Sequence, residues 1–196
     1  MILSFDDLAF KFREYVDVKG KIRREVEAGR LIKIKKGLYE TNPDTDGKYL
    51  AGVIYNPSYI SFEYVLSKYS IIPEAVYNTY TCATFRKRRT KQYSNHFGTF
   101  LYRDIPEAVY RFGIDLVVEN GYSYQMAVPE KALCDKIYTV SPVGSIKALE
   151  ELLFEDLRID EDMLFNELDK DSICWLCPLY KSTNLDLLAR FLKGGQ

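Results

Sequence analysis

Eight cations lie close together between residues 19 and 36, where only Glu25 and Glu27 oppose them, so this segment has a net charge of +6. The whole chain of 196 residues carries −1. Lysine and arginine side chains gathered in this way can neutralise phosphates, and such contacts supply most non-specific affinity for DNA. A basic surface that meets only solvent is the other interpretation. The cations we consider for phosphate contacts are Lys19, Lys21, Arg23, Arg24, Lys33, Lys35 and Lys36.

A second basic cluster lies in the middle of the chain, within a stretch that has no acidic residue between Thr84 and Arg103. It follows the sequence TYTCATF and precedes the aromatic sequence FGTFLYR. Cations beside aromatic side chains can hold nucleic acid through phosphates and stacking. The same cluster could instead meet an acidic protein, or form a solvated loop. Its members are Arg86, Lys87, Arg88, Arg89 and Lys91.

The acidic counterpart of these clusters is residues 150–171, where ten acidic side chains and two cations give a net charge of −8. This segment could repel DNA and so orient the protein, or it could dock a basic partner. A solvated helix face is the third interpretation.

Catalytic chemistry has little support in the sequence. His96 is the only histidine, so it cannot build a metal site with other imidazoles, and no phosphate-binding glycine loop is present. Cys174 and Cys177 have C-x-x-C spacing, but their apolar surroundings favour buried, reduced thiols. We therefore expect no enzyme activity, no cofactor and no metal. A metal-dependent nuclease with scattered carboxylates is the remaining enzymatic alternative.

The first cluster falls on a helix followed by a hairpin. Asp17 can cap a helix whose apolar positions include Ile22 and Val26, and Gly29 can end it because glycine accepts a positive φ. From Leu31 the apolar period becomes two, which indicates a half-buried strand, and a turn at residues 36–37 leads into a return strand. A basic helix followed by a basic hairpin is the second half of a winged helix, so we expect DNA binding there.

The turn residues, helix caps and apolar periodicity in the rest of the chain predict an α+β fold. It has a small N-terminal winged-helix-like unit, a mixed strand-rich domain and C-terminal helices. The turn-rich segment 41–48 separates the expected domains, residues 1–40 and 48–196. Gly194 and Gly195 are expected to end the last helix. We expect helices over residues 4–15, 58–69, 129–138, 144–155, 160–169 and 184–192, and strands over residues 76–84, 92–95, 99–103, 110–112, 116–119 and 122–127.

The sequence contains no apolar run of transmembrane length, and its first ten residues carry acids where a signal peptide needs bases. The four cysteines fit a reducing compartment. A cytoplasmic protein without membrane contact is therefore expected.

Five residue patterns occur in order over about residues 20–140: GRLIKIKKGLYE, YISFEYVLSKYSIIPE, YTCATFRKRRTKQY, FGTFLYR and MAVPEKALCDKIY. In this combination the chain resembles the AbiEi family, antitoxins and transcriptional regulators of bacterial type IV toxin–antitoxin systems. The resemblance implies that the winged helix binds double-stranded operator DNA and represses the operon. It implies a C-terminal domain that neutralises a nucleotidyltransferase-like toxin of the AbiEii type without requiring a stable complex. The two basic clusters above would supply the DNA contacts.

One feature departs from the pattern. A full winged helix has three helices before its wing, whereas only about thirty residues precede the wing here, enough for two. The alternative function is therefore a protein-interaction module whose degenerate winged helix binds no specific DNA.

Overall fold

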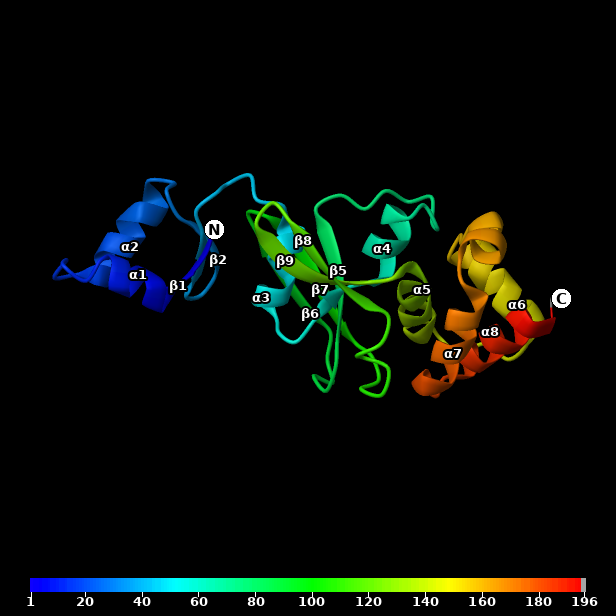
Figure 1. Ribbon diagram of the computed structural model, residues 1–196. Coiled ribbons are helices and arrows are strands. Elements are labelled where there is room, and N and C mark those ends of the chain that lie inside the picture. Colours follow the sequence, from blue (N-terminus) through cyan, green and yellow to red (C-terminus); the bar gives the residue numbers. More distant parts are fainter. Residues whose placement is uncertain (195–196) are drawn as a thin grey trace.

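The computed structural model describes residues 1–194 and has the expected α+β architecture. Its parts follow one another along the molecule in chain order (Figure 1). The first is a small unit of residues 1–40, which we call the winged unit. The second is a six-stranded central sheet, and the third is a group of helices at the C-terminal end.

The winged unit contains a three-stranded antiparallel sheet and two helices. The strand order is β1-β3-β2, and both helices lie between β1 and β2 in the chain. The helix that is missing is therefore the first of the three, since α1, a turn and α2 directly precede the wing. The elements are β1 (Ile2–Ser4), α1 (Phe5–Lys11), α2 (Val18–Glu27), β2 (Ile32–Lys35) and β3 (Leu38–Glu40).

Local signals set the boundaries of these elements. The Asp17 side chain accepts a hydrogen bond from the backbone of Gly20 and so caps α2, as expected. Gly29 and Gly37 have φ values of 70° and 76°, which confirms a glycine after α2 and a tight turn in the wing. The helix expected over residues 4–15 is shorter: α1 ends at Lys11, and the chain then turns toward α2.

The small sheet lies between the two helices and the rest of the protein. Leu8, Ile22 and Leu31 form a small buried core on the helix side. On the other side Ile34 belongs to the main core, and Ile32 packs against it. The winged unit is thus joined to the central sheet by apolar packing, and the division at residues 41–48 stays a prediction about independent domains.

The central sheet has the order β6-β7-β5-β4-β9-β8. Its neighbours are antiparallel except for the pairs β5–β7 and β4–β9, which are parallel. The strands are β4 (Tyr59–Ile60), β5 (Thr79–Thr84), β6 (Lys91–Asn95), β7 (Gly98–Asp104), β8 (Ile114–Glu119) and β9 (Tyr122–Ala127).

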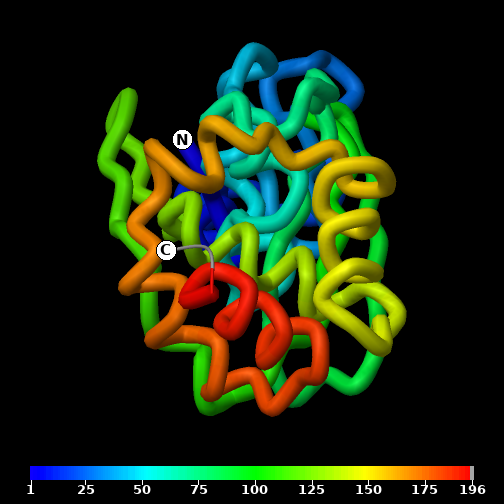
Figure 2. Tube along the Cα trace, turned by 90° about the vertical axis from the view of Figure 1, so that its right-hand side faces the viewer, coloured from blue at the N-terminus to red at the C-terminus, as the bar shows by residue number. Residues whose placement is uncertain are grey.

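Helices cover the sheet on the side of the C-terminus, and Figure 2 shows the last of them in front of it. Residues 152–156 and 163–167 are helical turns of π type. Gly194 is the last residue of α8 as described, and Gly195, also expected to end it, lies outside the described residues. The helices are α3 (Ala51–Ile54), α4 (Phe62–Lys68), α5 (Pro129–Tyr138), α6 (Ile146–Glu151), α7 (Lys170–Tyr180) and α8 (Thr183–Gly194), with a 3₁₀ turn at Gly47–Tyr49.

Two further expected elements need correction, and one helix was not expected. The helix expected from residue 58 begins at Phe62, because Tyr59 and Ile60 pair with β5 and β9 as a short strand. Residues 110–112 form local turns rather than a strand, because the backbone N–H groups of Tyr110 and Phe112 donate to the carbonyls of Glu107 and Val109. Helix α7 was not predicted from the sequence, although the Asp169 side chain caps its first turn.

A fully buried polar cluster connects α5, α7 and β4. The Lys131 ammonium donates to Asp135 Oδ1 at 2.5 Å and to the Tyr180 hydroxyl at 2.6 Å. Tyr59 and Ser61 donate to Asp135 Oδ2 at 2.9 and 2.7 Å. Burial lowers the pKa of Lys131, so the charge on this lysine depends on the carboxylate beside it.

Asp135→Ala is expected to destabilise the protein by about 3–5 kcal/mol, because it leaves a buried cation without its partner. The measurement is the free energy of unfolding in urea, with Asp186→Ala on α8 as the control. A loss below about 1 kcal/mol, the scale of an ordinary surface change, would contradict this role.

Candidate nucleic-acid interface

One face of α2 and the wing enclose a groove, which we call the α2–wing groove. Residues 19, 22, 23 and 26 lie three or four positions apart, so their side chains share one face of α2. Exposed cations border the groove, and half-buried apolar side chains form its floor. The lining residues are Phe5, Lys19, Ile22, Arg23, Val26, Lys33, Lys36, Gly37 and Tyr39.

Four cations of the first cluster are available to a ligand. Within residues 1–194, Lys19, Arg24, Lys33 and Lys36 make no ion pair, and all four are exposed. Arg23 makes only a 3.5 Å pair with exposed Glu27, which is worth little in water. The structure therefore brings Lys19, Arg23, Lys33 and Lys36 together around one groove.

Lys21 instead contributes to the packing of α2, through an ion pair with Glu25. Its ammonium lies 2.7 Å from Glu25 Oε1, while the Arg30 guanidinium contacts the same carboxylate at 2.6 and 3.0 Å. The ammonium also lies 4.9 Å from the centre of the Tyr15 ring in the turn before α2. These contacts fix α2 to its neighbours. The hydrogen bonds from Arg30 and then Lys21 lower the pKa of Glu25 to about 2.

Lys35 also points away from the groove. Its ammonium donates to the carbonyls of Val53 and Ile54, both at 2.8 Å, at the end of α3. The cause is an irregular register in the wing, because Lys33 pairs with Tyr39 while Lys35 pairs with the adjacent Leu38. Such a bulge redirects a side chain and cannot be recognised from alternation alone. Lys35 therefore connects the wing to α3, and burial lowers its pKa.

The second cluster forms the loop between β5 and β6. Arg86 and Arg88 have φ values of 58° and 54°, so the loop is tightly folded. Arg86 pairs with Glu107 at 2.6 Å, and Lys87 donates to the carbonyl of Asn56 at 3.2 Å. Within residues 1–194 the side chains of Arg88, Arg89 and Lys91 have no ion-pair partner.

The two basic clusters meet at the end of α3. Lys35 contacts carbonyls 53 and 54, Lys87 contacts carbonyl 56, and the Lys87 ammonium lies 5.1 Å from the centre of the Tyr55 ring. Sequence reasoning missed α3, because it is only four residues long. The short helix nevertheless places the wing beside the loop that carries the second cluster.

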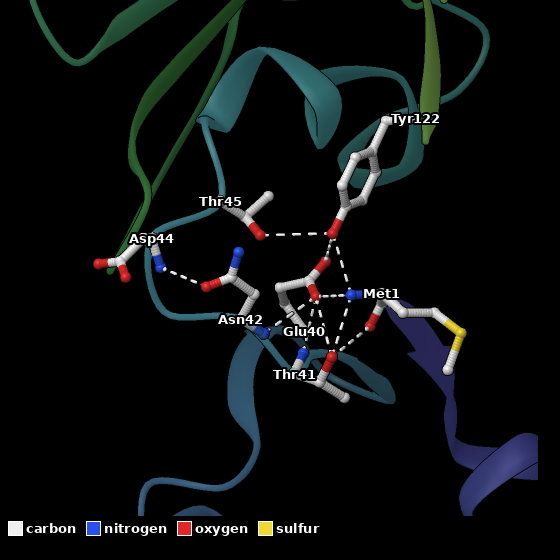
Figure 3. A network of polar contacts seen from close by, with 7 residues as sticks. All are labelled: Met1, Glu40, Thr41, Asn42, Asp44, Thr45 and Tyr122. Atoms are coloured by element: carbon white, nitrogen blue, oxygen red, sulfur yellow. Dashed lines mark hydrogen bonds and ion pairs between the residues drawn. The ribbon is translucent and has the colours of Figure 1, made fainter. Parts of the chain in front are cut away.

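A polar network fixes the winged unit to β9 (Figure 3). Its centre is the completely buried Glu40, whose carboxylate accepts hydrogen bonds from the Met1 amino group and the backbone of Thr41 and Asn42. The Tyr122 hydroxyl of β9 donates to Glu40 Oε2 at 3.1 Å. Burial alone would raise the pKa of Glu40, but these hydrogen bonds outweigh it and hold the pKa below its usual value.

The acidic segment lies at the opposite end of the molecule from the winged unit (Figure 1). It includes the end of α6, both π turns and the start of α7. The molecule is therefore electrically polar along its length. None of the helices in residues 1–194 has the length and apolar character that crossing a membrane requires.

Of the two cysteines expected to be buried, Cys177 is buried and Cys174 is not fully so. Cys82, Cys134 and Cys177 are buried, and Cys174 is half-buried on α7. Burial raises the pKa of Cys82, which keeps this thiol protonated.

Comparison of the chain with protein-family models gives no match, and comparison with curated proteins gives none either.

The contribution of Glu25 to stability should disappear in acid. Its pKa is about 2 in the folded chain, against about 4.3 for an unperturbed glutamate, so the stabilisation is complete above pH 4.3 and is lost as the pH falls toward 2. The measurement is the difference in free energy of unfolding between the unmodified protein and Glu25→Gln across this range. Glu27→Gln, on the exposed side of α2, is the control and should show no comparable change.

Proposed function

We propose that this protein binds double-stranded DNA through its winged unit. The observation that carries the proposal is the α2–wing groove and the cations that border it. Within residues 1–194 only one of these cations, Arg23, makes an ion pair, and that pair is exposed and weak. An α-helix is about 10–12 Å across with its side chains and so fits the major groove, which is about 12 Å wide; the ten residues of α2 extend over about 15 Å. Lys33 and Lys36 on the wing would then contact the adjacent phosphates.

The second cluster extends the same contact. Because α3 holds the wing beside the β5–β6 loop, the cations of both clusters are fixed relative to one another. Arg88, Arg89 and Lys91 can face the phosphates of one duplex together with the winged unit. Lys21, Lys35 and Lys87 bind to other parts of the protein and are excluded from our proposed phosphate contacts. Arg86 would first have to leave its exposed pair with Glu107.

The biological part of the proposal is an antitoxin that represses its own operon. It rests on the resemblance to the AbiEi family and on the separation of charge along the molecule. A nucleotidyltransferase-like toxin would be the functional partner, acting in the cytoplasm. The acidic end is free to face another protein while the basic end holds DNA, because the two ends lie far apart.

A protein-interaction module is the second candidate. The observation that favours it is the floor of the groove, where Phe5, Val26 and Tyr39 are only half-buried in the absence of a third helix. DNA offers few apolar groups to such a floor, whereas an amphipathic peptide offers many. This candidate predicts no retardation of any promoter fragment.

DNA binding is tested with a labelled fragment of the native promoter over a range of salt concentrations. Lys36→Met should weaken binding and lower the magnitude of the salt slope by about 1, because one phosphate contact is lost. Lys35→Met is the matched control one residue away. It should leave the slope unchanged and lower the free energy of unfolding by about 1–3 kcal/mol, since charged hydrogen bonds to α3 are lost. No retardation at low salt would contradict DNA binding.

Antitoxin function is tested by co-expression with a nucleotidyltransferase-like toxin of the AbiEii type. The unmodified protein should restore growth, and so should Lys33→Glu/Lys36→Glu, because neutralisation would not use the groove. Promoter repression should be lost in the same variant. Failure of the folded, unmodified protein to restore growth would contradict the antitoxin role without affecting the result on DNA.

A further inference from the structure

Strand β8 leaves one edge of the central sheet open. It is the last strand in the order β6-β7-β5-β4-β9-β8, so no strand within residues 1–194 pairs with its outer side. All six of its residues pair with β9 without a bulge. In Figure 2 the hairpin of β8 and β9 stands at the margin of the molecule, with β8 outermost. An edge of this length presents unpaired N–H and C=O groups to any suitable strand.

Strand β8 lacks most of the usual protection of an edge strand. Proteins prevent edge pairing with charged side chains, lysine above all, and with proline, bulges or covering segments. Strand β8 has no lysine, proline or bulge, and its two charges, Asp115 and Glu119, alternate with Leu116 and Val118 and so belong to the other face. Leu116 and Val118 are 67% and 73% exposed on one face, beside exposed Ser123 and Gln125 of β9. On this face the exposed side chains of β8 itself are therefore apolar.

The opposite edge of the sheet shows the contrast. Strand β6 begins with Lys91, and its exposed side chains, Gln92 and Ser94, are polar. Its end is covered by the winged unit, where the Asn95 side chain donates to the carbonyl of Ile34 at 3.0 Å. One edge of the sheet is protected and the other is open. The open edge has unpaired backbone groups that another strand can bind.

We propose that β8 pairs with β8 of a second copy of this chain, in antiparallel orientation about a twofold axis. In an antiparallel pair, directly opposite residues lie on the same face of the sheet. A twofold axis keeps each residue on its own face, and successive residues alternate between faces, so a residue cannot face its own neighbour in the chain. The axis must therefore pass through a residue that faces its own copy. Within β8 the central registers are those on Leu116, Val117 and Val118.

Charge and turn geometry select the register centred on Leu116. Centring on Val117 would place Asp115 opposite Glu119 twice, and like charges directly opposite one another destabilise a sheet. Centring on Val118 would require Leu116 to face Asn120, which has a φ of 51° and belongs to the turn after β8.

In the chosen register each Leu116 faces Leu116 of the other copy, and Ile114 faces Val118. Asp115 then faces Val117 and meets no acidic residue across the interface. The three apolar side chains of each copy form one stripe on the exposed face of a twelve-stranded sheet. Five residues on each side bury less than the about 1,200 Å² of a standard stable interface, so the dimer forms in a concentration-dependent way.

The mass of the complete chain in sedimentation tests the association. It should rise with concentration from 22.8 kDa toward twice that value. Leu116→Lys should remain monomeric at concentrations where the unmodified protein is dimeric, because a charged side chain at the edge opposes pairing. Ser123→Lys, on the same face but one strand inward, is the matched control and should still dimerise. Circular dichroism establishes that both variants are folded.

Cysteine crosslinking with a mild thiol oxidant tests the register, in a Cys174→Ser background that removes the half-buried native thiol. Leu116→Cys should give a disulfide-linked dimer, since opposite Cβ atoms lie about 4.5–5.5 Å apart. Val118→Cys is equally exposed but faces Ile114, so it should not crosslink. A chain that stays monomeric, a Leu116→Lys variant that dimerises like the unmodified protein, or crosslinking through residue 118 in place of 116 would overturn the proposal.

Discussion

The buried carboxylate of Glu40 is the interaction on which the arrangement of this protein depends. A charge without exposure is costly unless it is paired and hydrogen-bonded, and Glu40 meets this condition with donors from three parts of the chain. These donors belong to the start of the winged unit, to the connection after β3 and to β9. The charge can therefore be accommodated only when the winged unit is seated on the central sheet. The position of the α2–wing groove follows from that seating.

Cations in this protein serve two purposes, and the structure separates them. Some complete the fold: Lys21 and Arg30 hold Glu25, Lys35 holds the end of α3, and Lys131 holds Asp135. Others have only solvent beside them and remain available for phosphates. A basic segment with a net charge of +6 therefore has fewer unpaired cations than its composition suggests. Lys19, Arg23, Lys33 and Lys36 line one groove, so their charges face the same space.

Local signals made the winged unit and the sheet hairpins predictable. Capping by Asp17, the two glycine turns and the alternation around Ile32 and Ile34 depend on neighbouring residues, so they can be recognised without the fold. Predictions failed where distant residues decided the outcome. Tyr59 and Ile60 became a strand because β5 and β9 flank them, and α7 was obscured by an apolar run that contains Pro178.

The sequence by itself determined the α+β class, the helix-and-wing pattern and the two places where cations accumulate, because periodicity, caps and charge are properties of short segments. Only the tertiary structure decided which of those cations are free, that Lys35 and Lys87 meet at α3, and that Glu40 fixes the winged unit to β9. It also decided that one edge of the sheet is covered while β8 is open. These outcomes depend on contacts between residues that are far apart in the chain. A local pattern does not show which distant group will pair with a charge or with the edge of a strand.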